Sequence, residues 1–319
     1  MRNKIASTKS EIMKGIELWN KENPEFEIRE RLVEQNIFSP FANINVVCIN
    51  FYMKNEISAF GIIKYLDKEI KNYVDKTQGW ISLLAVDPDC KEKKEVIVNS
   101  LKILEEFLVM KGVKNIRFGG DPQNFLAGLP SSSWNDYLGI FKEMGYKKGV
   151  IEFDLKRNIK KFDFQRNIKE YKSLSIERVY KTNEDKLYDF LEKNFPGRWF
   201  FEAKNIGHIP GGLRDYWFLE YNKKVVGFAR TNTIDSTYKG PNINWVTELG
   251  DKYCGLGPLG IANDYRNKGW GLFMIAEIIK ELKNEGYKEM VIDWTTLVDY
   301  YKKLGFGIYK KYLTLEKKV

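Results

Sequence analysis

The stretch Leu259–Ile279, LGIANDYRNKGWGLFMIAEII, constrains the fold of this chain more than any other. It reads as the end of a buried strand, a turn and then a helix of several turns. Gly269 and Gly271 let backbone N–H groups face outward at the start of that helix. The partial positive charge of a helix N-terminus favours a phosphate group. The turn is therefore a candidate binding site for a pyrophosphate.

The residues that follow extend this pattern. Lys288–Trp294 is a second strand candidate, Thr296–Leu304 is a short helix candidate, and Tyr301–Phe306 is the run YKKLGF. The order is strand, R-x-x-G-x-G, helix, strand, and a helix that ends in Y-x-K-x-G-F. This order resembles the GCN5-related N-acetyltransferase (GNAT) superfamily.

The resemblance implies that acetyl-coenzyme A is the ligand and that its acetyl group is transferred to an amine. In this superfamily the strand before the turn splays from its neighbour and pairs with the pantetheine arm, which implicates the backbone of Leu259 and Ile261. Arg266 matches a family Arg/Gln position that supports the loop or a phosphate, or it is an ordinary surface arginine. The backbone amides implied to hold the pyrophosphate are those of Asn267, Lys268, Gly269, Trp270, Gly271 and Leu272.

Tyr301 matches the family tyrosine whose hydroxyl protonates or stabilises the departing thiolate. A positioned donor lowers the energy of the charge that develops on sulfur. Two alternatives remain open. Tyr301 could be a packing aromatic of an amphipathic helix, and the neighbouring Tyr300 could face the site instead.

The general base is not identified by the sequence. The family often uses a glutamate or a chain of waters near the splayed strands, yet Tyr253–Ala262 contains no carboxylate. The family asparagine on the short helix is also missing, with Trp294 or Thr295 nearby. Candidates by residue type alone are Glu248, Asp293, Glu202 and His208.

Recognition of the amine is expected from Phe195–Gly212, where aromatic residues stand beside a charge pair. Arg198, Trp199 and Glu202 are the candidate acceptor-binding residues, because such a group can line an amine or sugar pocket. An aromatic cluster that packs a short helix onto the sheet is an equally good reading of the same residues.

The pattern of elements occurs twice along the chain. We predict an α/β (α+β) protein of two tandem GNAT-like domains, each a mixed, mostly antiparallel sheet with a V-shaped splay flanked by helices. The expected domains are residues 1–157 and 173–319, joined by a connector at residues 158–172. Expected helices are Thr8–Glu22, Glu27–Asn36, Lys94–Lys111, Asp136–Met144 and Glu184–Asn194, and expected strands include Val46–Met53, Ile57–Leu66, Trp80–Val86, Lys114–Phe118, Gly149–Leu155, Ser175–Tyr180, Asp215–Tyr221, Val225–Thr231 and Phe306–Leu315.

The first copy departs from the second at both chemically demanding positions. Lys94 and Val96 stand where the second copy has its two glycines, and Phe141 stands opposite Tyr301. We therefore expect the first copy to be a degenerate domain that is structural or shapes the substrate site. It also carries an insertion, Gly119–Asn135, which reads as a loop.

The charge and cysteine content of the chain limit the kinds of partner that it is expected to bind. The net charge is +9, but the lysines are dispersed, which argues against nucleic acid and suits acidic or phosphorylated ligands. Cys48, Cys90 and Cys254 have no metal-binding spacing, so no metal is expected. No apolar run reaches the length of a membrane span, and Met1–Glu11 lacks a signal-peptide core. We therefore expect a cytoplasmic protein with a small-molecule amine as its partner.

Three functions fit these residues. The first is acetyl transfer from acetyl-coenzyme A to a small amine, with the second copy catalytic and Tyr301 as donor. The second is an acyl-coenzyme A binding or sensing protein without catalysis. The third is transfer of an aminoacyl or longer acyl group.

Overall fold

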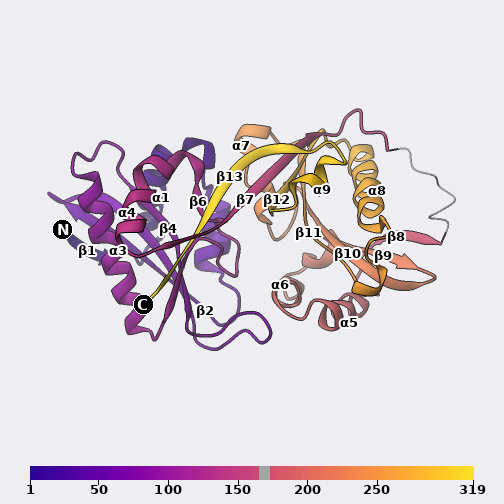
Figure 1. The fold of residues 1–319 in the computed structure, drawn as a ribbon, viewed down its shortest axis with the longest axis horizontal. Coiled ribbons are helices and arrows are strands. Elements are labelled where there is room, and N and C mark those ends of the chain that lie inside the picture. The colour runs from indigo at the N-terminus through magenta and orange to yellow at the C-terminus, as the bar shows by residue number, and fades with distance from the viewer. Residues whose placement is uncertain (165–172) are drawn as a thin grey trace. The chain divides into compact units, whose positions relative to one another are not determined.

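The computed structural model describes residues 1–164 and 173–319, and these residues form two compact units (Figure 1). Unit 1 contains Met1–Glu152 and Lys310–Val319, and unit 2 contains Phe153–Tyr309. Of the expected connector 158–172, residues 165–172 lie outside the described residues.

The sheet of unit 1 has the strand order β1, β2, β3, β4, β5, β13 and β7. Its β4 and β5 are parallel, whereas β1–β2, β2–β3, β3–β4 and β5–β13 are antiparallel pairs. The strand bounds are β1 Arg2–Ile5, β2 Ile44–Met53, β3 Glu56–Leu66, β4 Gln78–Val86, β5 Asn115–Phe118, β7 Lys147–Asn158 and β13 Gly307–Lys318, and the short β6, Leu129–Pro130, pairs with β13.

The helices of unit 1 follow the apolar periodicity of the sequence. In α1 (Lys9–Glu22), Thr8 and Glu11 form a capping box, which satisfies donors at the helix start. The expected helix over Glu27–Asn36 is present only as the single turn α2 (Glu30–Val33) followed by η2 (Glu34–Phe38). The remaining elements are α3 Lys93–Met110, α4 Trp134–Glu143, η1 Pro24–Phe26 and η3 Ser131–Ser133.

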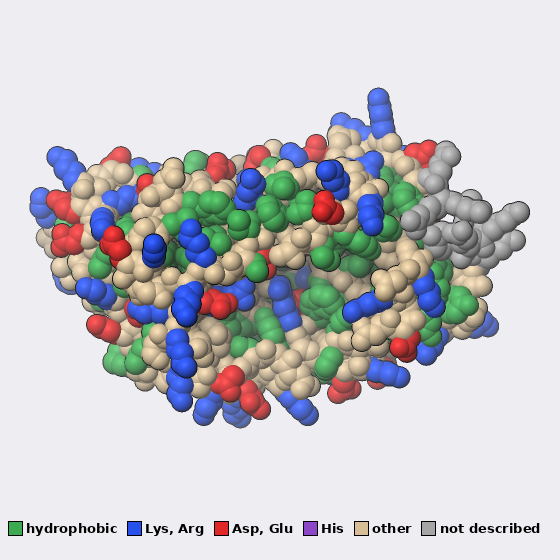
Figure 2. Space-filling model, in the orientation of Figure 1, with side chains coloured by type: hydrophobic (Ala, Val, Ile, Leu, Met, Phe, Trp, Pro, Cys, Tyr) green, Lys and Arg blue, Asp and Glu red, His purple; other side chains and the backbone are tan. Residues whose placement is uncertain are grey.

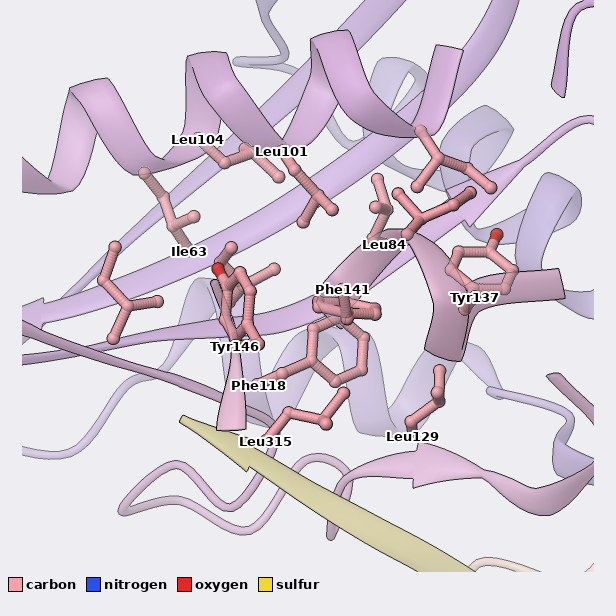
Figure 3. Packing of buried hydrophobic residues seen from close by; sticks show 14 of the residues in the cluster. Ile63, Leu84, Leu101, Leu104, Phe118, Leu129, Tyr137, Phe141, Tyr146 and Leu315 are labelled. Atoms are coloured by element: carbon pink, nitrogen blue, oxygen red, sulfur yellow. The ribbon is translucent and has the colours of Figure 1, made fainter. Parts of the chain in front are cut away.

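The core of unit 1 lies between α3, α4 and one face of the sheet (Figure 3). Leu101 and Leu104 of α3 point toward the sheet in this core, and both are fully buried. Phe141 of α4 packs edge to face on Phe118, with ring centroids 5.0 Å apart. Burial of this apolar surface is the main driving force for folding of the unit.

Strands β7 and β13 each belong to both units. β7 begins in unit 1 and ends in unit 2, whereas β13 begins in unit 2 and ends in unit 1. In unit 1, β13 lies between β5 and β7. Leu313 and Leu315 of β13 are part of the core cluster that contains Leu101 and Phe141. The last strand of the chain therefore completes the first unit.

The sheet of unit 2 has the order β8, β9, β10, β11, β12 and β7, with β11 and β12 parallel and the other pairs antiparallel. The bounds are β8 Leu174–Arg178, β9 Tyr216–Tyr221, β10 Lys224–Asn232, β11 Tyr253–Ile261 and β12 Glu289–Thr295. The helices are α5 Glu184–Asn194, α6 Arg198–Gly207, α7 Val246–Leu249, α8 Trp270–Asn284 and α9 Val298–Lys302, with turns η5 Gly212–Asp215, η6 Pro241–Ile243 and η7 Asn263–Tyr265.

Helix α8 is the central helix of unit 2. Its inner face carries Met274, Ile275, Ile278 and Ile279, all fully buried in one cluster with the sheet. Helix α6 agrees with one of the two readings of Phe195–Gly212, a short helix packed onto the sheet by an aromatic cluster, and it begins directly after Pro196 and Gly197.

The predicted fold class is confirmed, since each unit is a mixed sheet flanked by helices with one parallel strand pair. Among the described residues no helix is both long and apolar enough to cross a membrane. Figure 2 shows basic and acidic side chains interspersed on the face drawn, as the dispersed lysines of the sequence indicate.

We expect Leu315→Ala to destabilise unit 1 by about 2–5 kcal/mol, because truncation of a buried leucine leaves a cavity. Urea unfolding measures the change. The neighbouring exposed Glu316→Ala is the matched control and should cost less than about 0.5 kcal/mol. Equal effects would mean that β13 does not complete the core of unit 1.

Candidate functional site

The site of unit 2 begins where β11 and β12 separate. The two parallel strands pair from Tyr253 and Glu289 as far as Leu256 and Ile292, and β11 then continues to Ile261 without this partner. On its other side β11 stays paired with β10. The unpaired edge of β11 leaves backbone hydrogen-bonding groups available to a ligand.

The start of α8 presents free backbone donors at the end of this strand. Asn267 and Gly269 have φ angles of 61° and 74°, so the turn reaches the helix through two left-handed residues. Gly269 is the N-cap and no side chain caps the helix. The N–H groups of Trp270, Gly271 and Leu272 belong to the first turn, where an α-helix has no internal acceptor for them. This arrangement suits a phosphate.

The turn is held in place by side chains. Arg266 Nε donates a hydrogen bond of 2.9 Å to the carbonyl of Ile261, so this arginine ties the turn to the end of β11. The indole of Trp270 stacks on Tyr265 at 5.5 Å and contacts Tyr221 at 4.9 Å. The ammonium of Lys268 lies over both the Tyr265 and the Trp270 ring. The candidate pyrophosphate site is therefore preformed.

The two tyrosines of α9 lie differently. A Cβ atom built on Gly271 would stand 2.3 Å from the Tyr300 hydroxyl, so that hydroxyl lies against the first turn of α8. Tyr301 is nearly buried, and its ring meets Phe306 and Tyr300 edge to face. Burial raises the Tyr301 pKa, and the charges of Tyr300 and Asp293 add to that shift. A neutral Tyr301 hydroxyl is a proton donor.

Asp293 stands at the point where the strands part. A Cβ atom on Gly257 would lie 2.3 Å from Asp293 Oδ1, so only glycine fits opposite this carboxylate. Asn242 Nδ2 donates a hydrogen bond of 2.7 Å to the same oxygen. Burial raises the pKa of Asp293, against the hydrogen bond from Asn242 and the charge of Arg198, while Glu202 adds to the rise.

A β-bulge in β12 includes Asp293 and Trp294. Ile292 pairs with Leu155 of β7 and Thr295 pairs with Phe153, so β12 has one residue more than β7 over this span. Within the bulge, Trp294 has a φ angle of 43°, a strained value for a tryptophan. Bulges next to active sites commonly redirect a side chain.

The bulge is held by a second buried carboxylate. Asp154 of β7 is fully buried and accepts hydrogen bonds from the backbone N–H of Trp294 at 3.2 Å and from Trp245 Nε1 at 2.9 Å. These contacts satisfy donors that would otherwise be buried without a partner.

The three candidate acceptor residues lie on the first turns of α6. Arg198 and Glu202 form an ion pair at 2.7 Å, and Arg198 lies over the Trp294 ring at 5.9 Å. Trp199 instead packs on Phe195 and Phe228, with centroids 4.9 and 5.4 Å away. The charge pair is thus directed toward Asp293 and its neighbours, while Trp199 joins an aromatic cluster.

The remaining base candidates differ in burial. Glu248 on α7 and His208 at the end of α6 are exposed. Glu202 is buried and paired with Arg198. Asp293 is partly buried, and no ion pair to it occurs in residues 1–164 and 173–319.

The corresponding helix start of unit 1, that of α3, is surrounded by ion pairs. Lys93 forms ion pairs with Glu22 at 3.1 Å and with Asp136 at 2.6 Å, and Lys21 pairs with Asp87. Val96, at the position of Gly271, is a buried core residue, as is Phe141 at the position of Tyr301. Acidic side chains and their lysines thus surround this helix start.

The strand separation of unit 1 is followed by a buried segment. β4 and β5 pair as far as Ile81 and Phe118, and residues 119–130 come directly after β5. Asp121 of this segment forms a fully buried ion pair of 2.9 Å with Lys64 of β3. The insertion is a loop as far as β6, as expected, but this loop is largely buried, and its buried side chains include Asp121, Gln123, Phe125, Leu126, Ala127 and Leu129.

The cysteines are not placed for chemistry. Burial raises the pKa of Cys48 to about 12 and also raises that of Cys254, so both stay thiols. A thiol that does not ionise is a poor nucleophile. In the described part of the chain no group of three or more His, Cys, Asp or Glu side chains could hold a metal ion.

Comparison with known proteins agrees with this geometry. Residues 179–306 match the model of the acetyltransferase (GNAT) family, a range that spans β9–β12, α8 and α9. The chain therefore carries a GNAT domain, as the resemblance at Leu259–Phe306 predicts. No curated protein sequence is significantly similar to the chain.

Three solved structures extend the likeness over almost the whole chain. A GCN5-related glucosamine N-acetyltransferase region of a fungal GH3 β-N-acetylglucosaminidase is 18% identical with a TM-score of 0.84, over 99% of this chain and 38% of that protein. A GCN5-related N-acetyltransferase from Sphaerobacter thermophilus is 13% identical (TM-score 0.65, 99% and 95% covered). A tandem GNAT protein from the clavulanic acid biosynthesis pathway is 7% identical (TM-score 0.65, 99% and 98% covered). The chain thus has the fold of tandem GNAT proteins.

We expect Asp154→Ala to lower the stability of unit 2 by about 2–5 kcal/mol, because two buried donors lose their acceptor. Thermal unfolding followed by tryptophan fluorescence measures the change. Asp154→Asn, which keeps an acceptor oxygen, should cost less, and the exposed Asp251→Ala should cost under about 0.5 kcal/mol. A small effect of Asp154→Ala would mean that this carboxylate does not hold the bulge.

Proposed function

We propose that the protein is an N-acetyltransferase that moves the acetyl group of acetyl-coenzyme A to a primary amine of a small molecule, with unit 2 catalytic. The observation that carries this is the open edge of β11 leading into the uncapped first turn of α8. The GNAT family model covers both elements.

In this proposal the donor lies along β11 and ends at α8. The backbone of Leu259 and Ile261 pairs with the pantetheine arm. Ile261 already accepts a hydrogen bond from Arg266, so its N–H and the groups of Leu259 are the ones left for the ligand. Residues Asn267 to Leu272 hold the pyrophosphate with their N–H groups.

Tyr301 supplies the proton to the departing thiolate. As the C–S bond breaks, negative charge develops on sulfur, and a nearby neutral hydroxyl stabilises it. The raised pKa of Tyr301 supports this role, since it keeps the hydroxyl protonated. Tyr300 is the competing donor, because its hydroxyl lies against Gly271.

The other functions are weaker on specific grounds. A protein that only binds acyl-coenzyme A has no use for a polar cluster of Asp293, Asn242, Arg198 and Glu202 beside the strand opening. Transfer of an aminoacyl or longer acyl group needs a larger acyl pocket, and no residue of the site favours it. We propose an amine as the acceptor because the Asp293 carboxylate, the one carboxylate of this cluster that is not paired with Arg198, attracts an ammonium group.

We expect Gly271→Glu to weaken acetyl-coenzyme A binding by about 100-fold or more, roughly 3 kcal/mol, since it adds bulk and negative charge at the phosphate site. Isothermal titration calorimetry measures the dissociation constant. Gly271→Ala adds the same Cβ without charge and should weaken binding less. The control in unit 1 is Lys94→Glu, an exposed residue of the first turn of α3 at the position of Gly269, and this change should leave the affinity unchanged. Equal losses from Gly271→Glu and Lys94→Glu would place the donor outside unit 2.

We expect Tyr301→Phe to lower kcat by about 100-fold or more while acetyl-coenzyme A affinity stays within about threefold, because the hydroxyl acts on the developing thiolate. Release of coenzyme A in the presence of a panel of amines measures the rate. Tyr300→Phe is the paired variant. A large loss with Tyr300→Phe and none with Tyr301→Phe would assign the donor role to Tyr300, and no turnover by the wild type with any amine would reject the proposed function.

A further inference from the structure

We propose that Asp293 is the general base of unit 2, and that Asn242 and the bulge at Trp294 position its carboxylate toward the ammonium group of the acceptor. This inference rests on the proposed acetyl transfer and assigns a role that the sequence leaves open. It stands on the geometry of one carboxylate at the point where β11 and β12 separate.

The position of Asp293 matches where an acceptor amine must lie. In the proposed complex the donor runs from the start of α8 past Ile261 and Leu259, so its thioester end reaches the place where the two strands separate, after Leu256 and Ile292. Asp293 is the next residue of β12, and Gly257, the next residue of β11, has no side chain between them. A base must come within hydrogen-bond reach of the proton that it removes.

One of the two carboxylate oxygens of Asp293 is fixed by a hydrogen bond. Asn242 Nδ2 donates to Oδ1 at 2.7 Å and to the Gly257 carbonyl at 3.4 Å, and the Asn242 side chain is fully buried. Asn242 cannot rotate freely, because its amide also packs against the bare Cα of Gly255. One oxygen of Asp293 is thus fixed by a neutral donor, and Oδ2 is the oxygen available for a proton.

The charged groups around Asp293 suit a base. Arg198 and Glu202 face Asp293 from α6, and their charges largely cancel because they form an ion pair. Tyr301 faces Asp293 from α9. Asp154 of β7 accepts a hydrogen bond from the backbone N–H of Trp294. Desolvation raises the pKa of Asp293 above its ordinary value. A raised pKa brings a carboxylate closer to the range in which it accepts a proton from an ammonium group at neutral pH.

The strained bulge supports a functional role for this residue. Trp294 has a left-handed backbone that costs free energy, and Asp154 and Trp245 stabilise it from within the core. Asp293 and Trp294 together lie opposite Asp154, between the pairs Ile292–Leu155 and Thr295–Phe153, so the bulge leaves Asp293 outside the regular ladder with β7.

The proposed reaction begins with a proton transfer from the acceptor. The Asp293 carboxylate takes one proton from the ammonium group and becomes a carboxylic acid. The neutral nitrogen then forms a C–N bond to the thioester carbonyl carbon, and the C–S bond breaks as the tetrahedral intermediate collapses. The thiolate takes a proton from Tyr301, which regains one from the nitrogen, and Asp293 later releases its proton to water.

We test the proposal with Asp293→Asn, which keeps the shape and the contact with Asn242. We expect kcat/KM for an alkyl amine at neutral pH to fall by about 100-fold to 10,000-fold, with acetyl-coenzyme A affinity unchanged. The deficit should shrink as the pH approaches the pKa of the acceptor, because the amine then needs no base. Glu202→Gln is the competitor variant, and the exposed Asp251→Asn is the matched control that should keep wild-type rates.

Stability gives a readout that does not depend on activity. The folded pKa of Asp293 is raised, so the folded state binds its proton more tightly than the unfolded state, and ionisation destabilises the fold. Asp293→Asn should therefore have the same melting temperature as the wild type below the unfolded pKa of an aspartate. It should have a higher melting temperature above the folded pKa, and this comparison also shows that the variant folds.

Each outcome decides the proposal. A rate within about threefold of wild type for Asp293→Asn at neutral pH, or a loss that follows Glu202→Gln instead, would overturn the role of Asp293 and leave the proposed function standing. A deficit that stays constant at all pH values would also overturn it, because a merely structural residue behaves in that way. No acetyl transfer by the wild type to any amine would overturn both proposals together.

Discussion

The separation of two parallel strands is the constraint on which unit 2 depends. β11 and β12 are paired over a few residues and then separate. At the separation Gly257, which has no side chain, lies opposite Asp293, and Asn242 lies beside both residues. A strand edge cannot be left with unpaired polar groups unless water or a ligand satisfies them. In unit 2 the open edge of β11 is followed by the first turn of α8, whose N–H groups are hydrogen-bond donors. One extended anionic molecule can therefore pair with the strand edge and with the helix start.

Unit 1 also has a parallel strand pair that separates, but the segment after its β5 carries a charge into the core. Asp121 of this segment forms a fully buried ion pair with Lys64. Burying two charges is costly unless they are paired and hydrogen-bonded, and here Asn36 also accepts from Lys64. The two units thus differ after their parallel strand pairs: in unit 1 the segment after β5 is buried around an ion pair, whereas in unit 2 β12 is followed by the short helix α9 with Tyr300 and Tyr301.

Much of the fold could be predicted because it is local. The periodicity of α3, α5 and α8 and the alternation around the β9–β10 turn appear directly in the sequence. The glycine-containing turn before α8 also carries its own signal. Helix α6 could be predicted only as one of two readings, because the aromatic residues after Gly197 fit both a pocket lining and a short helix packed on the sheet. The sequence could not show which carboxylate lies at the strand separation with a positioned side chain. The position of Asp293 depends on a hydrogen bond from Asn242, which is distant in the sequence, and on a bulge in the pairing of β12 with β7.

The exchange of β7 and β13 has a consequence for how the protein is made. The strand that lies between β5 and β7 in unit 1 is separated along the chain from Met1–Glu152 by the whole of unit 2, so a chain synthesised only that far has β5 as an open sheet edge. An open edge is a template for pairing with other chains. A fragment of residues 1–152 therefore lacks one strand of its own sheet.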